Sequence, residues 1–127
     1  MFKMKAVFID VEKGEIRDIE FKGKLEDFYH YIHCDIVDAV PFPDDENHDV
    51  VVDDEGLLKK IVGFFSIDDD SEPQYAGNGI IVGVNNNVGK WISSKYSAED
   101  IKRRITFWTV KYTPMGNFLV KQPSNEE

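Results

Sequence analysis

Apolar and polar residues alternate through the start of the chain. In residues 2–9 the alternation is partial: Phe2, Met4, Ala6 and Phe8 fall on one face, with Lys3 and Lys5 opposite. A second run, EIRDIEF at 15–21, follows a polar turn around Lys13 and Gly14. A period of two is typical of a β-strand with one face in a core, so residues 2–21 are predicted to form a β-hairpin. In LEDFYHYI, at 25–32, the apolar residues are instead three and four positions apart. This spacing predicts a short amphipathic helix.

Four apolar runs in the middle of the chain predict further strands. They are IVDAVPF at 36–42, DVVVDD at 49–54, residues 63–67 after a short helical turn, and GIIVGV at 79–84. Turn-forming residues separate these runs. PDDENH is predicted to form a loop, and Asn85 to Gly89 a turn.

A second helix is predicted to begin at Ser97, an N-cap candidate with Asp100 three residues further on, in a pattern that resembles a capping box. Apolar residues then recur at helical spacing until Pro114 and Gly116 end the segment. The stripe consists of Ile101, Ile105, Trp108 and Tyr112. With NFLVK as a small edge strand, the order of elements predicts an α+β domain over residues 1–122, in which two amphipathic helices pack against a largely antiparallel sheet. Residues 123–127 are predicted to form a flexible tail.

Composition supports a folded chain of one domain. Its 127 residues are 42% hydrophobic and 13% aromatic, which is the range of globular proteins. Cys34 is the single cysteine, so an internal disulfide is excluded. No signal peptide and no apolar run near 18 residues is visible, which predicts a soluble, cytoplasmic protein with no membrane contact.

The formal net charge of −9 is unevenly distributed. Residues 35–72 hold 13 acids and 2 bases, a local charge of −11, whereas residues 90–111 hold 6 bases and 2 acids, a local charge of +4. An acidic chain is a poor general binder of long nucleic acids, because phosphate binding requires clustered lysine and arginine. The asymmetry suggests two surfaces with different partners, or one subunit that meets another, although acidic loops also serve solubility alone.

Patterns that suggest catalysis or metal binding fail on geometry. HYIHCD, at 30–35, pairs two histidines, but a zinc site needs three or four converging ligands and only His48 remains elsewhere. DDDSEP begins like a calcium loop, yet Pro73 stands where the turn needs glycine. The glycines of GNGIIVG open a strand, whereas a dinucleotide fingerprint lies between a strand and a helix. We therefore expect no catalytic residue, no metal site and no cofactor.

What remains is a set of residues suited to binding. Asparagine amides both donate and accept hydrogen bonds, which suits base edges and ribose hydroxyls. Arginine binds phosphates through two parallel hydrogen bonds, and aromatic faces stack on bases. The candidate ligand-binding residues are Tyr75, Asn78, Asn85, Asn86, Asn87, Arg103, Arg104, Phe64 and Phe65. Each also has an ordinary structural interpretation: the asparagines as a hairpin turn, the arginines as solvated helix positions.

The succession CDIVDAV, VVVDDEGLLKK, GNGIIVG with the asparagine turn, and a capped SAEDI helix covers most of residues 5–108. It resembles a family of small phage- and prophage-encoded proteins, many described only as a domain of unknown function, that includes the Thoeris anti-defence sponges. Members of this type are non-enzymatic sponges. They bind cyclic ADP-ribose isomers made by bacterial immune enzymes, and some members assemble as dimers or larger rings and also hold cyclic oligonucleotides.

The resemblance implies a phage protein that sequesters a cyclic ADP-ribose isomer in the cytoplasm of the infected bacterial host, as a homo-oligomer. It implies an aromatic residue for the adenine, asparagine for the ribose and arginine for the pyrophosphate, which we carry to Tyr75, Asn85–Asn87, Arg103 and Arg104. The N-terminal half offers only Arg17 as a further guanidinium. The alternative is an acidic protein-binding inhibitor that mimics the charge of DNA against a restriction or CRISPR nuclease, motivated by the −11 stretch at 35–72.

Overall fold

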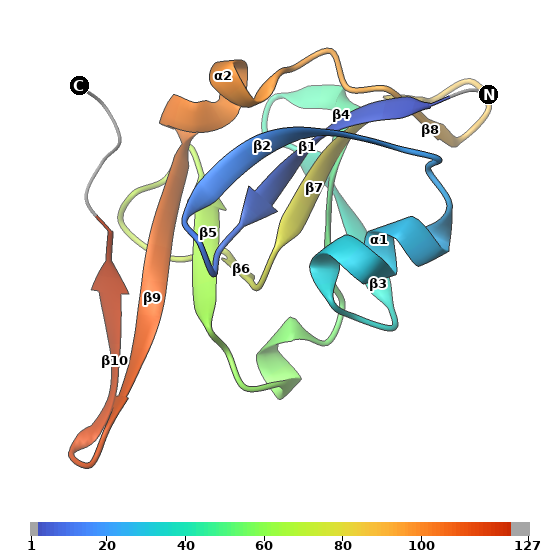
Figure 1. The fold of residues 1–127 in the computed structure, drawn as a ribbon. Coiled ribbons are helices and arrows are strands. Elements are labelled where there is room, and N and C mark those ends of the chain that lie inside the picture. The colour runs from blue at the N-terminus through green and yellow to red at the C-terminus, as the bar shows by residue number, and fades with distance from the viewer. Residues whose placement is uncertain (1–2, 123–127) are drawn as a thin grey trace.

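The computed structural model describes residues 3–122 and consists mainly of antiparallel strands with two short helices, an α+β fold as predicted (Figure 1). The helices are α1 (Leu25–Ile32) and α2 (Ala98–Ile101), with 3-10 turns at Gly56–Leu58 and Lys102–Arg104. The strands are β1 (Met4–Asp10), β2 (Glu15–Phe21), β3 (Val37–Phe42), β4 (Asp45–Asp53), β5 (Gly63–Ile67), β6 (Tyr75–Ala76), β7 (Gly79–Asn85), β8 (Lys90–Ile92), β9 (Ile105–Thr113) and β10 (Gly116–Lys121).

The strands form two sheets. In the six-stranded sheet, called sheet A, the order is β2-β1-β7-β4-β3, and β8 also pairs with β7. In the four-stranded sheet, called sheet B, the order is β10-β9-β5-β6. β7 is the central strand of sheet A: its first half pairs with β1 and its second half with β8, while β4 runs along its other edge.

Sheet A is covered on both faces. On one face, α1 places Phe28 and Ile32 against a cluster that includes Phe8, Ile80 and Val82. On the other face, residues of sheets A and B share a second cluster, which also contains Ile101 from α2. This arrangement explains the unbroken apolar run of β7, because a strand buried on both faces does not alternate.

The predicted second helix is wrong in extent. The capping box at Ser97 is present, with the Asp100 backbone N–H donating to Ser97 Oγ and the Ser97 N–H to Asp100 Oδ2. However, α2 ends at Ile101, and Ile105–Thr113 is a strand. The segment is rich in β-branched and aromatic residues, which favour strands, and pairing with both β5 and β10 overrides the helical spacing.

One other expectation needs correction. The region predicted as the loop PDDENH is largely strand, because β4 begins at Asp45 and pairs back to Phe42 through a register shift. Two of the three glycines of GNGIIVG serve packing: a Cβ at Gly79 would lie 2.6 Å from Phe65 Cζ, and one at Gly83 would lie 2.5 Å from the Ser93 carbonyl oxygen. The protein itself fills the space that these glycines leave.

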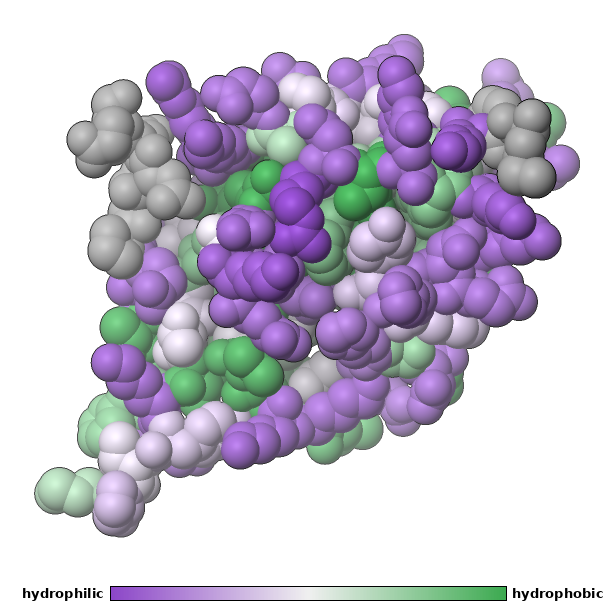
Figure 2. All heavy atoms as spheres, viewed as in Figure 1, coloured by the Kyte–Doolittle hydropathy of each residue, from purple (hydrophilic) through white to green (hydrophobic). Residues whose placement is uncertain are grey.

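The surface in the view of Figure 2 is mostly hydrophilic, with apolar side chains around the β9–β10 hairpin at its lower left. Within residues 3–122, no helix has the length and apolar character needed to cross a membrane. The predicted tail at 123–127 lies outside the described residues.

Candidate ligand-binding site

The asparagine turn between β7 and β8 borders a polar pocket of about 300 Å³. We call it the amide pocket, because four of its lining side chains are asparagines: Asn47 from β4, with Asn85, Asn86 and Asn87 from the turn. His48, Ser93 and Lys95 complete its polar lining, and Val84 and Ile92 contribute apolar surface. Three of the predicted ligand-binding residues therefore share one pocket.

The turn that carries the asparagines is rigidified by hydrogen bonds. The Gly89 N–H donates to the Asn85 carbonyl at 2.8 Å, and the Asn87 N–H donates to Asn85 Oδ1 at 3.1 Å, which forms an Asx turn. Asn86 Nδ2 donates to the Glu46 carbonyl at 3.0 Å, so that the turn is tied to β4. The Asn87 side chain is exposed. The fixed backbone presents its amide groups without a large ordering cost on binding.

Another wall of the amide pocket contains the buried imidazole of His48. The His48 side chain is 3% exposed, and its Nε2 accepts a hydrogen bond from the Lys95 backbone N–H at 3.1 Å. An accepting Nε2 carries no proton, so the proton of the neutral ring is on Nδ1. Nδ1 lies 3.1 Å from Asp45 Oδ2, close enough for attraction although not aligned as a hydrogen bond. His48 thereby fixes the backbone of Lys95 at the rim of the pocket.

Asp45 is a further anchor of this wall. Tyr96 donates its hydroxyl proton to Asp45 Oδ2 at 2.6 Å, and its ring centroid lies 4.6 Å from that of His48. The hydrogen bond from Tyr96 is the main cause that lowers the pKa of the Asp45 carboxyl from its usual value. The Lys95 backbone N–H and the Tyr96 hydroxyl are therefore held to β4 by His48 and Asp45.

Lys95 supplies positive charge to the amide pocket. Its side chain is exposed, and no carboxylate pairs with it among residues 3–122. Lys95 also borders a broader hollow of about 700 Å³ between β2 and residues 94–97. Amides, a hydroxyl and one ammonium group together can hold a polar ligand that has hydroxyls, a base edge and negative charge.

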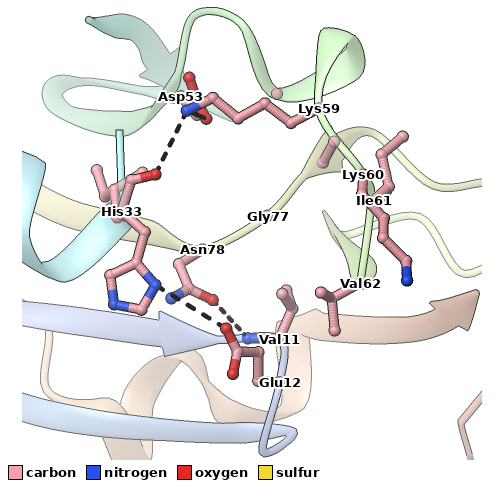
Figure 3. A pocket seen from close by; sticks show the side chains of 13 residues that line it. Val11, Glu12, His33, Asp53, Lys59, Lys60, Ile61, Val62, Gly77 and Asn78 are labelled. Atoms are coloured by element: carbon pink, nitrogen blue, oxygen red, sulfur yellow. Dashed lines mark hydrogen bonds and ion pairs between the residues drawn. The ribbon is translucent and has the colours of Figure 1, made fainter. Parts of the chain in front are cut away.

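Asn78 lies elsewhere and is structural. It is buried, with 5% exposure, where Oδ1 accepts from the Val11 N–H at 2.9 Å and Nδ2 donates to the Tyr31 carbonyl at 3.2 Å. It forms part of the wall of a smaller pocket of about 120 Å³ (Figure 3).

Several charged side chains of this smaller pocket are paired with neighbouring groups. Lys59 Nζ lies 2.8 Å from Asp53 Oδ2 and donates to the His33 carbonyl at 3.4 Å, while His33 Nδ1 is 3.9 Å from Glu12 Oε1 (Figure 3). The hydrogen bond with Asp53 is the main cause that raises the pKa of Lys59. The small volume of this pocket and its paired charges make it a weaker candidate for ligand binding than the amide pocket.

The two neighbouring arginines have different surroundings. Arg103 is exposed in the 3-10 turn after α2. Arg104 binds Asp68 through two nitrogens of one guanidinium edge, Nε to Oδ1 at 2.8 Å and a terminal nitrogen to Oδ2 at 2.5 Å. Its guanidinium carbon also lies 4.6 Å from the centroid of the Phe42 ring. Neither arginine lines the amide pocket. The phosphate role expected of Arg104 would require it to leave Asp68.

The aromatic candidates lie in sheet B. Phe65 is fully buried, and the half-buried Tyr75 packs on it with ring centroids 5.1 Å apart. Burial is the main cause that raises the pKa of the Tyr75 hydroxyl. Phe64 points away from the core, opposite Trp108 in the neighbouring strand. None of the three lines the amide pocket.

Sequence reasoning missed Asn47, His48 and Lys95 as parts of the site. Asn47 and His48 belonged to a segment predicted to be a loop, and only the pairing of β4 with β7 brings them beside the asparagine turn. No group of three or more potential metal-ligating side chains occurs in the described part of the chain.

The fold and the pocket define a small, mainly antiparallel α+β protein with an amide-lined polar pocket. A family model described as "Domain of unknown function (DUF3846)" matches residues 4–106, and the chain belongs to this family. Searches of the curated proteins and of the solved structures gave no match.

Proposed function

We propose that this chain is a phage anti-defence protein that binds and sequesters a cyclic ADP-ribose-type signalling nucleotide without degrading it. The amide pocket is the observation that carries the proposal. Its four asparagines offer donors and acceptors for base edges and ribose hydroxyls, and Lys95 offers a cation for the pyrophosphate. The resemblance of the sequence to Thoeris anti-defence sponges supplies the class of ligand, and by sequestering the signal the protein would block Thoeris immunity.

The positions of the predicted residues refine the proposal. Asn85, Asn86 and Asn87 line one pocket, whereas Arg104 is bound to Asp68 and Tyr75 packs against the core. Lys95 therefore replaces the arginines as the phosphate-binding residue of the proposed site. The pocket is open, and a scavenger gains affinity from closure, so we further propose that a homo-oligomer completes it.

The first test is the fate of the ligand. The protein is incubated with a cyclic ADP-ribose isomer, then heat-denatured, and the released nucleotide is analysed by chromatography. We expect a raised melting temperature, because a ligand that binds only the folded state stabilises it, and intact nucleotide on release. Hydrolysed product would identify an enzyme instead. Absence of a thermal shift with every cyclic ADP-ribose isomer and with cyclic oligonucleotides would exclude the proposed ligand class.

The second test locates the site. Lys95→Gln removes the proposed contact to phosphate, and Lys13→Gln, at an exposed lysine in the β1–β2 turn, is the matched control. A hydrogen bond to a charged group contributes about 1.5–3 kcal/mol, so Lys95→Gln should weaken binding roughly 10- to 150-fold in calorimetric titration. Equal affinities for the two variants would show that the ligand binds elsewhere on the protein.

The alternative, an acidic inhibitor of a nuclease, has less support from the contacts. Several carboxylates of the acidic segment already have partners within the fold: Asp45 with Tyr96, Asp49 with Trp91, Asp53 with Lys59 and Asp68 with Arg104. A mimic of DNA instead needs its charges free on one face. This function would give a complex with a basic protein that weakens steeply with salt, and no thermal shift with nucleotides.

A further inference from the structure

Sheet B carries apolar side chains on both faces. Residues directly opposite each other in antiparallel strands share a face, so the register places Phe64 beside Trp108, and Val110 beside Leu119. The Val110 N–H donates to the Val62 carbonyl at 3.2 Å, which places Val62, just before β5, beside Val110 on the same face. We call this surface the outer face of sheet B, and it consists of Val62, Phe64, Trp108, Val110, Tyr112 and Leu119. The opposite face holds Phe65, Ile67 and Phe107 in the core shared with sheet A.

Much of the outer face is open to solvent. Val62 is 49% exposed, Tyr112 47% and Leu119 45%. The register places Val62 and Leu119 on either side of Val110, with Tyr112 two residues further along β9. An antiparallel sheet with one solvated face normally alternates apolar and polar side chains, whereas apolar residues on both faces are typical of a sheet that is covered on both sides. Contiguous exposed apolar surface of this kind marks interaction sites.

Two further observations indicate what covers it. The outer edge of β10 has no strand partner among residues 3–122, so the hairpin of β9 and β10 is open at its edge as well as on its face. Residues 105–122 contain no Asp or Glu and two lysines, in a chain of net charge −9. Two copies of an acidic chain repel each other least where their acids are absent. An apolar face is also self-complementary under a two-fold axis, the commonest symmetry of soluble oligomers.

We propose that the outer face of sheet B is the contact between two copies of this chain, related by a two-fold axis. The apolar side chains of the two faces pack against each other, and lysines form the rim. Lys60 is one of them, with its Nζ 5.1 Å from the Tyr112 ring centroid. β10 and most of β9 lie beyond the family match at residues 4–106. None of the residues of the outer face lines the amide pocket, so this contact is separate from the one proposed to complete that pocket. It does not depend on nucleotide binding and therefore stands or falls separately from the proposed function.

The test measures mass without ligand. Light scattering and sedimentation of the full chain over a concentration series should give twice the 14.6 kDa of one chain. Leu119→Asp places an unpaired charge in the contact and should weaken association at least tenfold. Ile36→Asp, in the connection between α1 and β3, is the matched control: Ile36 is 49% exposed, and the substitution changes the net charge equally. It should leave the dimer intact.

Val62→Asp, on a different segment of the same face, provides a second variant if Leu119→Asp does not fold, as judged by circular dichroism. If the wild type has the mass of a single chain throughout the series, the proposal is wrong. The candidate occupant of the face would then be a different protein, one with an acidic surface. A dimer that neither Leu119→Asp nor Val62→Asp weakens would also overturn it, because the contact would then lie on another surface.

Discussion

Arg104→Ala should destabilise the fold, whereas Arg103→Ala should not. Arg104 forms a two-point ion pair with Asp68 and lies over the Phe42 ring. Its side chain is 30% exposed and that of Asp68 is 38% exposed, so the pair contributes about 1 kcal/mol, at the upper end for partly exposed pairs. The cation–π contact adds about 0.5–1 kcal/mol. We therefore expect a loss of about 1.5–2 kcal/mol in the free energy of unfolding.

The assay is urea unfolding at neutral pH, with thermal melts alongside. Each kcal/mol lowers the melting temperature by about 3–6 °C for a chain of this length. Arg103 is the matched control, because it is the adjacent arginine and is exposed. In a double-mutant cycle with Asp68→Asn, the coupling energy should be about 1 kcal/mol. Asparagine suits this position, where φ is 60°. Equal stabilities of the two arginine variants would refute the reasoning.

The ion pair between Arg104 and Asp68 also predicts that the free energy of unfolding depends on pH. The hydrogen bond from Arg104 is the main cause that lowers the pKa of Asp68 in the folded state. A carboxyl whose pKa is lowered by folding contributes stability above its unfolded pKa of about 3.9, and loses that contribution as the pH falls through the folded pKa. The difference in stability between wild type and Arg104→Ala should therefore narrow below about pH 4.

Three other substitutions test the packing and the buried polar contacts. Asn78→Ala should lower the free energy of unfolding by about 2 kcal/mol in urea titrations, since it leaves a buried backbone N–H unpaired; a change below the fitting error would contradict this. Gly79→Ala should cost about 1–3 kcal/mol by collision with Phe65, and combining it with Phe65→Leu should cost less than the sum of the two; strict additivity would disprove the collision. Tyr96→Phe should raise the pKa of Asp45 toward its usual value in a carboxyl NMR titration, so that less stability is lost as the pH falls through that pKa; an unchanged pKa would argue against the hydrogen bond.

Sequence patterns predicted local elements better than the second half of the fold. α1 follows from a clear period of three to four. The first hairpin follows from a period of two that is only partial in β1, because Val7 and Ile9 are buried on one face of the strand and Ala6 and Phe8 on the other. β9 was mistaken for helix because apolar residues lie on both of its faces, so that Ile101, Ile105, Trp108 and Tyr112 also fit a helical stripe. Its β-branched residues were the signal that favoured a strand.

The site was predictable only in part. The asparagine turn was identified from composition, and it does border a pocket. His48 and Lys95 reach the same place through long-range pairing, which a single sequence does not reveal. Asn78 has the residue type of a binding group but satisfies buried backbone atoms instead. Residue type alone does not distinguish these two uses of an amide.

The central position of β7 has a consequence for the order in which the protein folds. β1 and β4 are joined through this strand, with Val7 opposite Ile81 and Val50 opposite the same residue. During synthesis, the β1–β2 and β3–β4 hairpins emerge first and expose apolar faces until β7 leaves the ribosome and inserts between them. Because these contacts between distant parts of the sequence form late, folding is slow, and the incompletely folded chain is exposed to aggregation for longer. A nascent chain that ends before residue 79 would retain two hairpins without the strand that joins them.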